Sequence, residues 1–390
     1  MPNTSWSFRV WIICLASVLA VCAGCDSGKA GQSATATPEK PVPPKWEVSH
    51  ATKSASSAAF NYVAVTKDDV WALGQETDPR TEISRSLLLR YRDGKWEPAA
   101  FPPAYPKADL LSNVVLAASP AAPDVWLFAS FGNKPHAWRW DGSQWQVVPA
   151  AISPLAVLAL APDDIWAVDS KGPVLRHWDG RRWTDQKLAL QATALSATGP
   201  DDVWVAGTAA AKDGRLQPAI MHFDGRSWRA TPAPQYRFSK RPVSGDWATL
   251  QNIVAVSPDE AWAFGNHSIT SASQQEDIVL RWDGSRWADA PKPMHTWASA
   301  RDGEGGVILP DPGKQRTADG QDRPIGGPAL LPGLSGKITA ADRAQRFTAR
   351  ELTLDPRTKT VWGVGFVGSD ETTTTPFMRG VIVRFNPGRR

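Results

Sequence analysis

The sequence predicts an all-β protein built from consecutive four-stranded antiparallel units. A Val-Trp-type dipeptide recurs along the chain, and each copy is followed by an Asp-Gly turn between two alternating apolar runs. Asp-Gly between β-rich runs is a strong hairpin signal, because glycine adopts the positive φ that a tight turn needs. The chain also has 20 tryptophans, and most of them occupy fixed places in this repeat, where we expect them to pack between units.

The units follow one another in a regular order. The dipeptides are Val70-Trp71, Val125-Trp126, Ile165-Trp166, Val203-Trp204, Ala261-Trp262 and Val361-Trp362. The runs that contain the turn are residues 87–96, 137–145, 174–183, 219–228 and 278–287. Alanine-containing segments precede several dipeptides, at residues 61–66, 114–119, 155–161 and 252–257. Each unit is therefore predicted to hold four strands, named A to D from the innermost to the outermost.

Four strands in about 40–55 residues is the size of a propeller blade. In the long gap between Trp262 and Trp362, residues 297–309 look like an A–B hairpin with Ile308 in the tryptophan position. Residues 334–338 are expected to form its C–D turn. The predicted fold is a seven-bladed β-propeller of four-stranded antiparallel blades, with six blades and a long insertion as the alternative. The N-terminal strand around Trp46 is expected to close the ring by pairing into the last blade.

The repeat resembles the VWAVG…WDG…W repeats of bacterial secreted propellers over residues 46–390. It is loosely similar to WD-repeat, kelch and sialidase propellers. The GH…WD pairing, the diglycine of each kelch blade and the Asp-box spacing are missing from the sequence. The enzymatic functions of those families therefore do not carry over.

The N-terminus indicates export. Residues 10–21 are apolar but too few to span a bilayer comfortably, and they suit a signal peptide. Ala23-Gly24 before Cys25 resembles the lipobox of bacterial lipoproteins, with Cys22 where leucine is usual. The resemblance implies a signal peptide at residues 1–24 and acylation of Cys25; ordinary signal cleavage and an uncleaved anchor are the alternatives. Residues 25–45 are rich in Ser, Thr, Ala and Pro and predict a flexible tether, and residues 46–390 are the propeller.

Composition excludes several functions. All three cysteines lie in the leader, so the exported domain has no disulfide and no thiolate site. A net charge of +4 without a basic block gives no support to a nucleic-acid partner. We expect no metal, no cofactor and no catalytic residue, because no nucleophile or nucleotide motif is present and the six histidines lack helical i, i+4 spacing. We expect a monomer on the extracytoplasmic side of a bacterial cell envelope, in contact with the membrane only through the N-terminal lipid.

Two groups of side chains are expected on opposite faces of the ring. Strand C carries a basic residue before its last aromatic in six units, namely Arg90, Arg139, His177, His222, Arg281 and Arg384. These are predicted to pair with an aspartate of the A–B loops, which carry acidic pairs such as Asp68-Asp69 and Asp201-Asp202; a metal ring built from the aspartates is the alternative.

The B–C and D–A loops vary from unit to unit, and binding sites usually lie in such loops on a rigid scaffold. The candidate ligand-binding residues are Tyr236, Arg237, Phe238, Arg241, Trp247, His295 and Trp297. They are expected to form an aromatic, basic pocket near the channel mouth, suited to a sugar ring or a peptide. The alternative is that the indoles of Trp247 and Trp297 only plug the channel or cover a blade.

These features favour a binding module for a surface protein or a glycan rather than an enzyme. A carbohydrate-active hydrolase or lyase with two channel-mouth carboxylates is the alternative. An envelope assembly scaffold that acts through its outer blade edges is a third possibility.

Overall fold

The structure is a computed structural model that describes most of the chain after residue 41. The described residues are 42–53, 57–78, 80–106, 111–131, 134–150, 152–236, 246–269, 274–291, 298–309, 313–332, 336–368 and 378–388. The predicted signal peptide, Cys25 and most of the predicted tether lie outside these ranges. No helix within them has the length and apolar character needed to cross a membrane.

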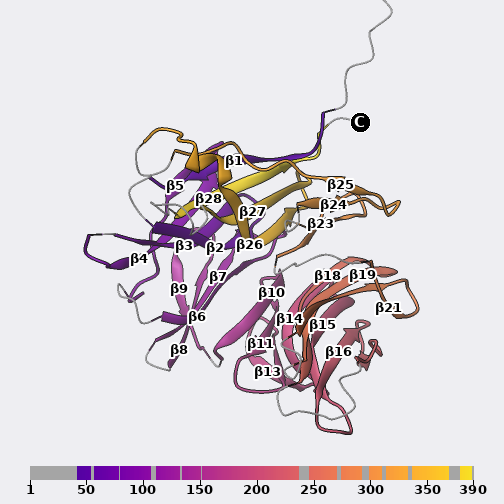
Figure 1. Cartoon of the computed structure of the whole chain (residues 1–390). Helices are drawn as coiled ribbons and strands as arrows, with labels where there is room; N and C mark the ends of the chain where they lie inside the picture. The colour runs from indigo at the N-terminus through magenta and orange to yellow at the C-terminus, as the bar shows by residue number, and fades with distance from the viewer. Residues whose placement is uncertain are drawn as a thin grey trace, which may run out of the picture. The chain divides into compact units, whose positions relative to one another are not determined.

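Nearly all regular structure is β-strand, arranged in consecutive antiparallel meanders (Figure 1). The first three sheets are β2–β5 (Ser57–Val65, Val70–Thr77, Ser84–Arg92, Lys95–Pro98), β6–β9 (Leu111–Ala118, Val125–Phe131, Lys134–Trp140, Trp145–Val148) and β10–β13 (Pro154–Ala161, Asp164–Asp169, Val174–Trp178, Trp183–Lys187). Then follow β14–β17 (Gln191–Gly199, Asp202–Ala210, Leu216–Phe223, Trp228–Ala230) and β18–β21 (Trp247–Ser257, Glu260–Ile269, Gln274–Trp282, Trp287–Asp289). The last are β22–β25 (Ala300–Arg301, Val307–Leu309, Lys314–Arg316, Asp322–Pro324) and β26–β28 (Arg346–Asp355, Thr360–Gly368, Met378–Asn386), with β1 (Lys45–Ala51) beside β28.

The predicted division into seven separate blades is wrong, and so is the alternative of six. The described strands form five separate four-stranded blades and one eight-stranded sheet. In that larger sheet the β14–β17 and β18–β21 meanders are joined by a parallel pairing of Leu216 with Trp247. The long β15–β16 hairpin extends beyond β17 and brings Leu216 to the first residue of β18, where their backbones pair.

The innermost strands enclose a central channel of about 430 Å³. They are β2, β6, β10, β14, β18, β22 and β26, and each contacts the next around the ring, including β26 with β2. The closure predicted around Trp46 is confirmed: β1 pairs antiparallel with β28, with Trp46 opposite Phe385. The indole of Trp46 is only 3% exposed. The topology therefore defines an all-β propeller whose first strand completes its last blade.

The β22–β25 blade has lost most of the repeat signature but keeps four short strands. Its predicted A–B hairpin is confirmed, and Ile308 in the tryptophan position is fully buried. Its C–D turn lies between β24 and β25, where Thr317 and Gln321 are hydrogen bonded. The expected turn at residues 334–338 is therefore wrong. That stretch belongs to the connection from β25 to β26, which contains a short 3₁₀ helix at Ala341–Ala344.

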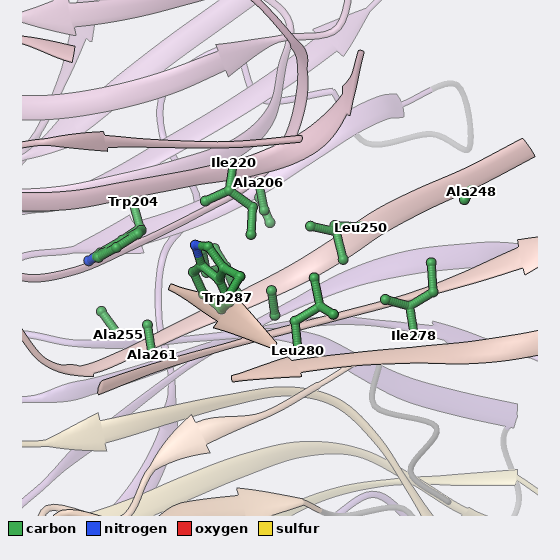
Figure 2. Close-up of a cluster of buried hydrophobic side chains, with 13 residues drawn as sticks. Trp204, Ala206, Ile220, Ala248, Leu250, Ala255, Ala261, Ile278, Leu280 and Trp287 are labelled. Carbon is green, nitrogen blue, oxygen red and sulfur yellow. The ribbon is translucent and has the colours of Figure 1, made fainter. Parts of the chain in front are cut away.

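The recurring tryptophans pack between neighbouring units. The dipeptide tryptophan of one unit contacts the two aromatic residues that flank the Asp-Gly turn of the next. The ring centroids of Trp204 lie 5.4 Å from Trp282 and 5.5 Å from Trp287, and Figure 2 shows Trp204 and Trp287 in the core between these units. Trp362 of the last unit contacts Tyr91 of the first at 5.0 Å. The predicted packing of tryptophans between units is confirmed, and it continues across the closure of the ring.

Candidate functional site

The predicted acid–base pairs form at five of the six positions. The pairs are Arg90–Asp69 at 2.5 Å, Arg139–Asp124 at 3.5 Å, His177–Asp164 at 2.8 Å, His222–Asp202 at 2.6 Å and Arg281–Glu260 at 3.1 Å. The sixth residue, Arg384, lies over the ring of Trp362 instead, 5.8 Å from its centroid. In the degenerate blade Gln315 occupies the equivalent register opposite Ile308, and its amide donates to Asp302 at 2.8 Å.

These pairs are structural. Burial alone would raise the pKa of Asp202, but hydrogen bonds from His222 and Thr198 outweigh it and lower that pKa. The ring of His222 also stacks on Trp204, with centroids 4.0 Å apart. Within the described residues no group of acidic, histidine or cysteine side chains has the arrangement of a metal site. The carboxylates therefore hold strand C and, in three units, also accept a hydrogen bond from the indole N–H of the dipeptide tryptophan.

Two of the predicted ligand-binding residues, Tyr236 and Trp247, are described; Tyr236 packs against the core between two units. The Tyr236 hydroxyl donates to Asp289 at 2.7 Å and its ring stacks on His267 at 5.2 Å. Burial and the Asp289 carboxylate raise the Tyr236 pKa. Trp247 opens β18 opposite Ser268, and it does not line the channel. Arg237, Phe238, Arg241, His295 and Trp297 lie outside the described residues, so the predicted pocket stays a prediction.

The channel wall carries polar groups that sequence reasoning did not single out. The free edges of the inner strands leave backbone groups that need partners, and side chains of neighbouring strands supply several of them. Thr193 donates to the carbonyl of Leu250 at 2.6 Å, and Ser196 accepts from the N–H of Ala255 at 2.9 Å. Alternating apolar residues in these strands gave no sign of which residues face the channel.

The most perturbed carboxyl group lies in this wall. Glu351 Oε2 accepts a hydrogen bond of 2.7 Å from the backbone N–H of Val63, across the closure of the ring. Burial raises the Glu351 pKa to about 8, although that hydrogen bond opposes the shift. Burial, together with the nearby Glu351, also raises the Tyr62 pKa to about 12. Among the described residues of the wall Glu351 is the one carboxylate, so this wall offers no acid–base pair of the glycosidase kind.

Large apolar side chains are exposed on one face of the ring. Six of the eight large hydrophobic residues exposed in the described part of the chain lie at strand ends or in connections on the B–C and D–A side. They are Ile83 at 62%, Phe131 at 39%, Leu155 at 47%, Leu216 at 41%, Leu330 at 37% and Ile338 at 48% exposure. We call these six residues the apolar loop face. The sequence could not reveal them, because an apolar residue at a strand end has the same pattern whether it is buried or exposed.

No family model and no curated protein matches this chain. Among solved structures, it is similar to the β-propeller domain of the Trilobed protease from Pyrococcus furiosus, with 8% identity, 82% of this chain and 95% of that chain covered, and a TM-score of 0.48. It is similar to YCF48 bound to D1 peptide, with 13% identity, 88% and 99% coverage and a TM-score of 0.41. It is also similar to the GH74 xyloglucanase from Xanthomonas campestris, with 14% identity and a TM-score of 0.41; 86% of this chain is covered but only 55% of that enzyme. At these values the likeness extends to the fold alone.

Proposed function

We propose that this propeller is a binding module that engages a protein or glycan partner through its apolar loop face. The observation that carries the proposal is that six of the eight large apolar side chains exposed in the described part of the chain lie on that face. Exposed apolar surface on one side of a protein can mark a binding site, and variable loops on a rigid scaffold are a common place for binding.

The opposite face is chemically different. Its Asp-Gly turns carry exposed aspartates that accept hydrogen bonds from their own turn. In Asp141 the bonds from the backbone of Gln144 and from Ser143 lower the pKa to about 2, and Asp283 is similar. These turns therefore remain charged and hydrated at neutral pH, which disfavours an apolar partner there.

Part of the apolar loop face is held in place by well-defined contacts. The connection from β25 to β26 carries Leu330 and Ile338. Gln345 makes two hydrogen bonds to the backbone of Leu331, at 2.9 and 3.0 Å. Arg379 donates to the carbonyl of Pro332 at 3.0 Å and to that of Thr52 at 2.9 Å. A connection fixed in this way loses little conformational entropy when a partner binds.

The proposal includes a location. We infer that Cys25 is acylated and that the propeller is held, as a monomer, on the extracytoplasmic side of a bacterial cell envelope. The sequence of the leader supports this, since it resembles that of a lipoprotein. Metabolic labelling with a palmitate analogue should mark the wild-type chain in the membrane fraction and fail to mark Cys25→Ser.

The binding role is tested with the full chain, purified in detergent. Wild type and the variants Ile83→Ser, Phe131→Ser and Ile338→Ser are applied to a glycan array and to envelope extracts, and any retained component is then titrated against each. We expect each variant to weaken binding by about tenfold, or about 1.4 kcal/mol. Val147→Ser is the matched control, because Val147 is 73% exposed but lies on the outer strand β9. If Ile83→Ser, Phe131→Ser and Ile338→Ser all bind as tightly as Val147→Ser, the apolar loop face is not the site.

A further inference from the structure

Arg301, in the channel wall, has no counter-ion among the residues that the structure describes. Arg301 ends the short inner strand β22, is half-buried and lines the channel. It makes no hydrogen bond or ion pair with any residue that the structure describes, whereas other half-buried arginines, such as Arg90 and Arg316, are paired with carboxylates. A charge withdrawn from water without a partner is costly, and burial accordingly lowers the Arg301 pKa.

Two further groups lie in the same wall. Arg350 is on β26, which contacts β22, and its guanidinium lies 5.3 Å from the ring centroid of Phe366 with no carboxylate partner among the described residues. The Ser299 hydroxyl, two residues before Arg301, is buried and lacks a hydrogen-bond partner there. The unsatisfied Ser299 hydroxyl is unusual, because buried polar groups are normally hydrogen bonded, whereas Arg350 is exposed.

The one channel carboxyl does not neutralise these cations. Glu351 bonds to the backbone of Val63 instead of to either arginine. With a pKa near 8, Glu351 is mostly protonated at neutral pH. The described wall therefore carries two positive charges and little negative charge inside a cavity of about 430 Å³. A cavity of this size holds a small molecule rather than a folded partner.

We propose that the channel is a binding site for a small oxyanion, with Arg301 as its principal ligand. A guanidinium presents two parallel N–H donors that match a carboxylate or a phosphate. The Ser299 hydroxyl adds a third donor immediately before the strand that carries Arg301, and Arg350 adds charge. Because Arg301 is half-buried, its charge is screened less than it would be in open water, which strengthens the attraction. Of the apolar loop face, Leu155 also lines the channel, but the anion site does not depend on the function proposed for that face.

The test uses the full chain and three probes: inorganic phosphate, glucuronate and uncharged glucose. Isothermal titration at low ionic strength should show binding of phosphate, glucuronate or both, and no binding of glucose. Which anion binds more tightly distinguishes a phosphate ligand from a carboxylate ligand. Arg301→Gln should weaken the affinity by about tenfold or more. Arg301→Lys should retain part of the affinity, because the positive charge remains but the two parallel N–H donors of the guanidinium are lost.

Arg286→Gln is the matched control, since Arg286 lies on an exposed C–D turn with 78% of its side chain accessible and should bind anions as wild type does. Thermal unfolding without anion shows whether Arg301→Gln folds; we expect it to melt no lower than wild type, because an unpaired cation is removed. Absence of binding for both anions, equal binding by Arg301→Gln, or equal binding of glucose would overturn the proposal. The variants Ile83→Ser, Phe131→Ser and Ile338→Ser, none of which lines the channel, should leave anion binding unchanged, so the two proposals fail separately.

Discussion

At the scale of the residue, Glu351 differs from the other acids of the molecule. Most acids of the A–B loops have cationic or histidine partners, and hydrogen bonds lower the pKa of Asp69 and Asp202 in spite of burial, although burial raises that of Asp124. Glu351 has only the backbone N–H of Val63, and burial dominates. The protonated carboxyl is therefore the stable form over much of the neutral range. Its contact joins β26 of the last blade to β2 of the first.

Glu351 should make the protein less stable as pH rises toward 8. The ordinary pKa of a glutamate is 4.5, and that of Glu351 in the folded chain is about 8, so the folded state holds the proton more tightly than the unfolded state. The stabilisation is fully present below pH 4.5 and is lost as pH rises through about 8. We expect the free energy of unfolding, measured in urea, to fall by about 2 kcal/mol between these limits, because channel water moderates the full effect of the shift.

Glu351→Gln should remove this dependence of stability on pH, and Glu97→Gln, on the exposed part of β5, should keep it. A slope unchanged in Glu351→Gln would contradict the assignment.

At the scale of the element, the inner strands share a β-bulge that explains the glycine of the repeat. An extra residue interrupts the pairing in several of them, such as Thr193 in β14 and Gln251 in β18. The glycine of the next strand lies opposite the residue before the bulge. A Cβ on Gly207 would collide with the backbone carbonyl of Gln191, and Gly265 has the same relation to Thr249. Glycine is thus required by close approach of two backbones.

Gly207→Ala should destabilise the propeller strongly. The methyl group would meet backbone rather than a flexible side chain, so the strands must separate, at a cost of about 2–3 kcal/mol. Gly199→Ala is the matched control, because a Cβ there has no atom within 4 Å and Gly199 has ordinary φ. Urea unfolding, followed by tryptophan fluorescence, measures the stability of both variants. Equal midpoints for the two variants would show that the bulge accommodates a side chain.

The sequence was informative about elements that repeat and poor where a unit departs from the pattern. Asp-Gly turns, buried tryptophans and the pairs of strand C with the A–B acids follow from local chemistry that every copy shares. The β16–β18 junction depends on where two strand ends meet in space, which no local pattern records. The C–D turn of the β22–β25 blade lacks Asp-Gly, so its place was misassigned. Arg301 and Glu351 acquire their character from the channel, and adjacent residues in sequence gave no indication of it.

At the scale of the whole molecule, the ring is held by contacts between residues 288 or more positions apart. β1 pairs with β28, Arg379 bonds to Thr52 and Glu351 bonds to Val63. Trp46 is the largest apolar side chain that β1 contributes, and it packs on Phe347 and Phe385 at 5.8 and 5.6 Å. Without β1, strand β28 would present a bare edge, which invites pairing with another chain.

Removal of β1 should therefore open the ring and expose β28. Trp46→Ala should lower the free energy of unfolding by about 3–5 kcal/mol, because a fully packed indole is lost. A chain that lacks residues 1–52 should melt lower still and associate with itself, whereas a chain that lacks residues 1–40 keeps β1 and should remain a monomer with the melting temperature of the full chain. Differential scanning calorimetry and analytical ultracentrifugation measure the melting temperature and the self-association.

A synthetic peptide of residues 42–53, added to the chain that lacks residues 1–52, should restore the monomer if the free edge of β28 is the cause. Should the chains that begin at residues 41 and 53 behave alike, β1 would have no part in holding the ring closed.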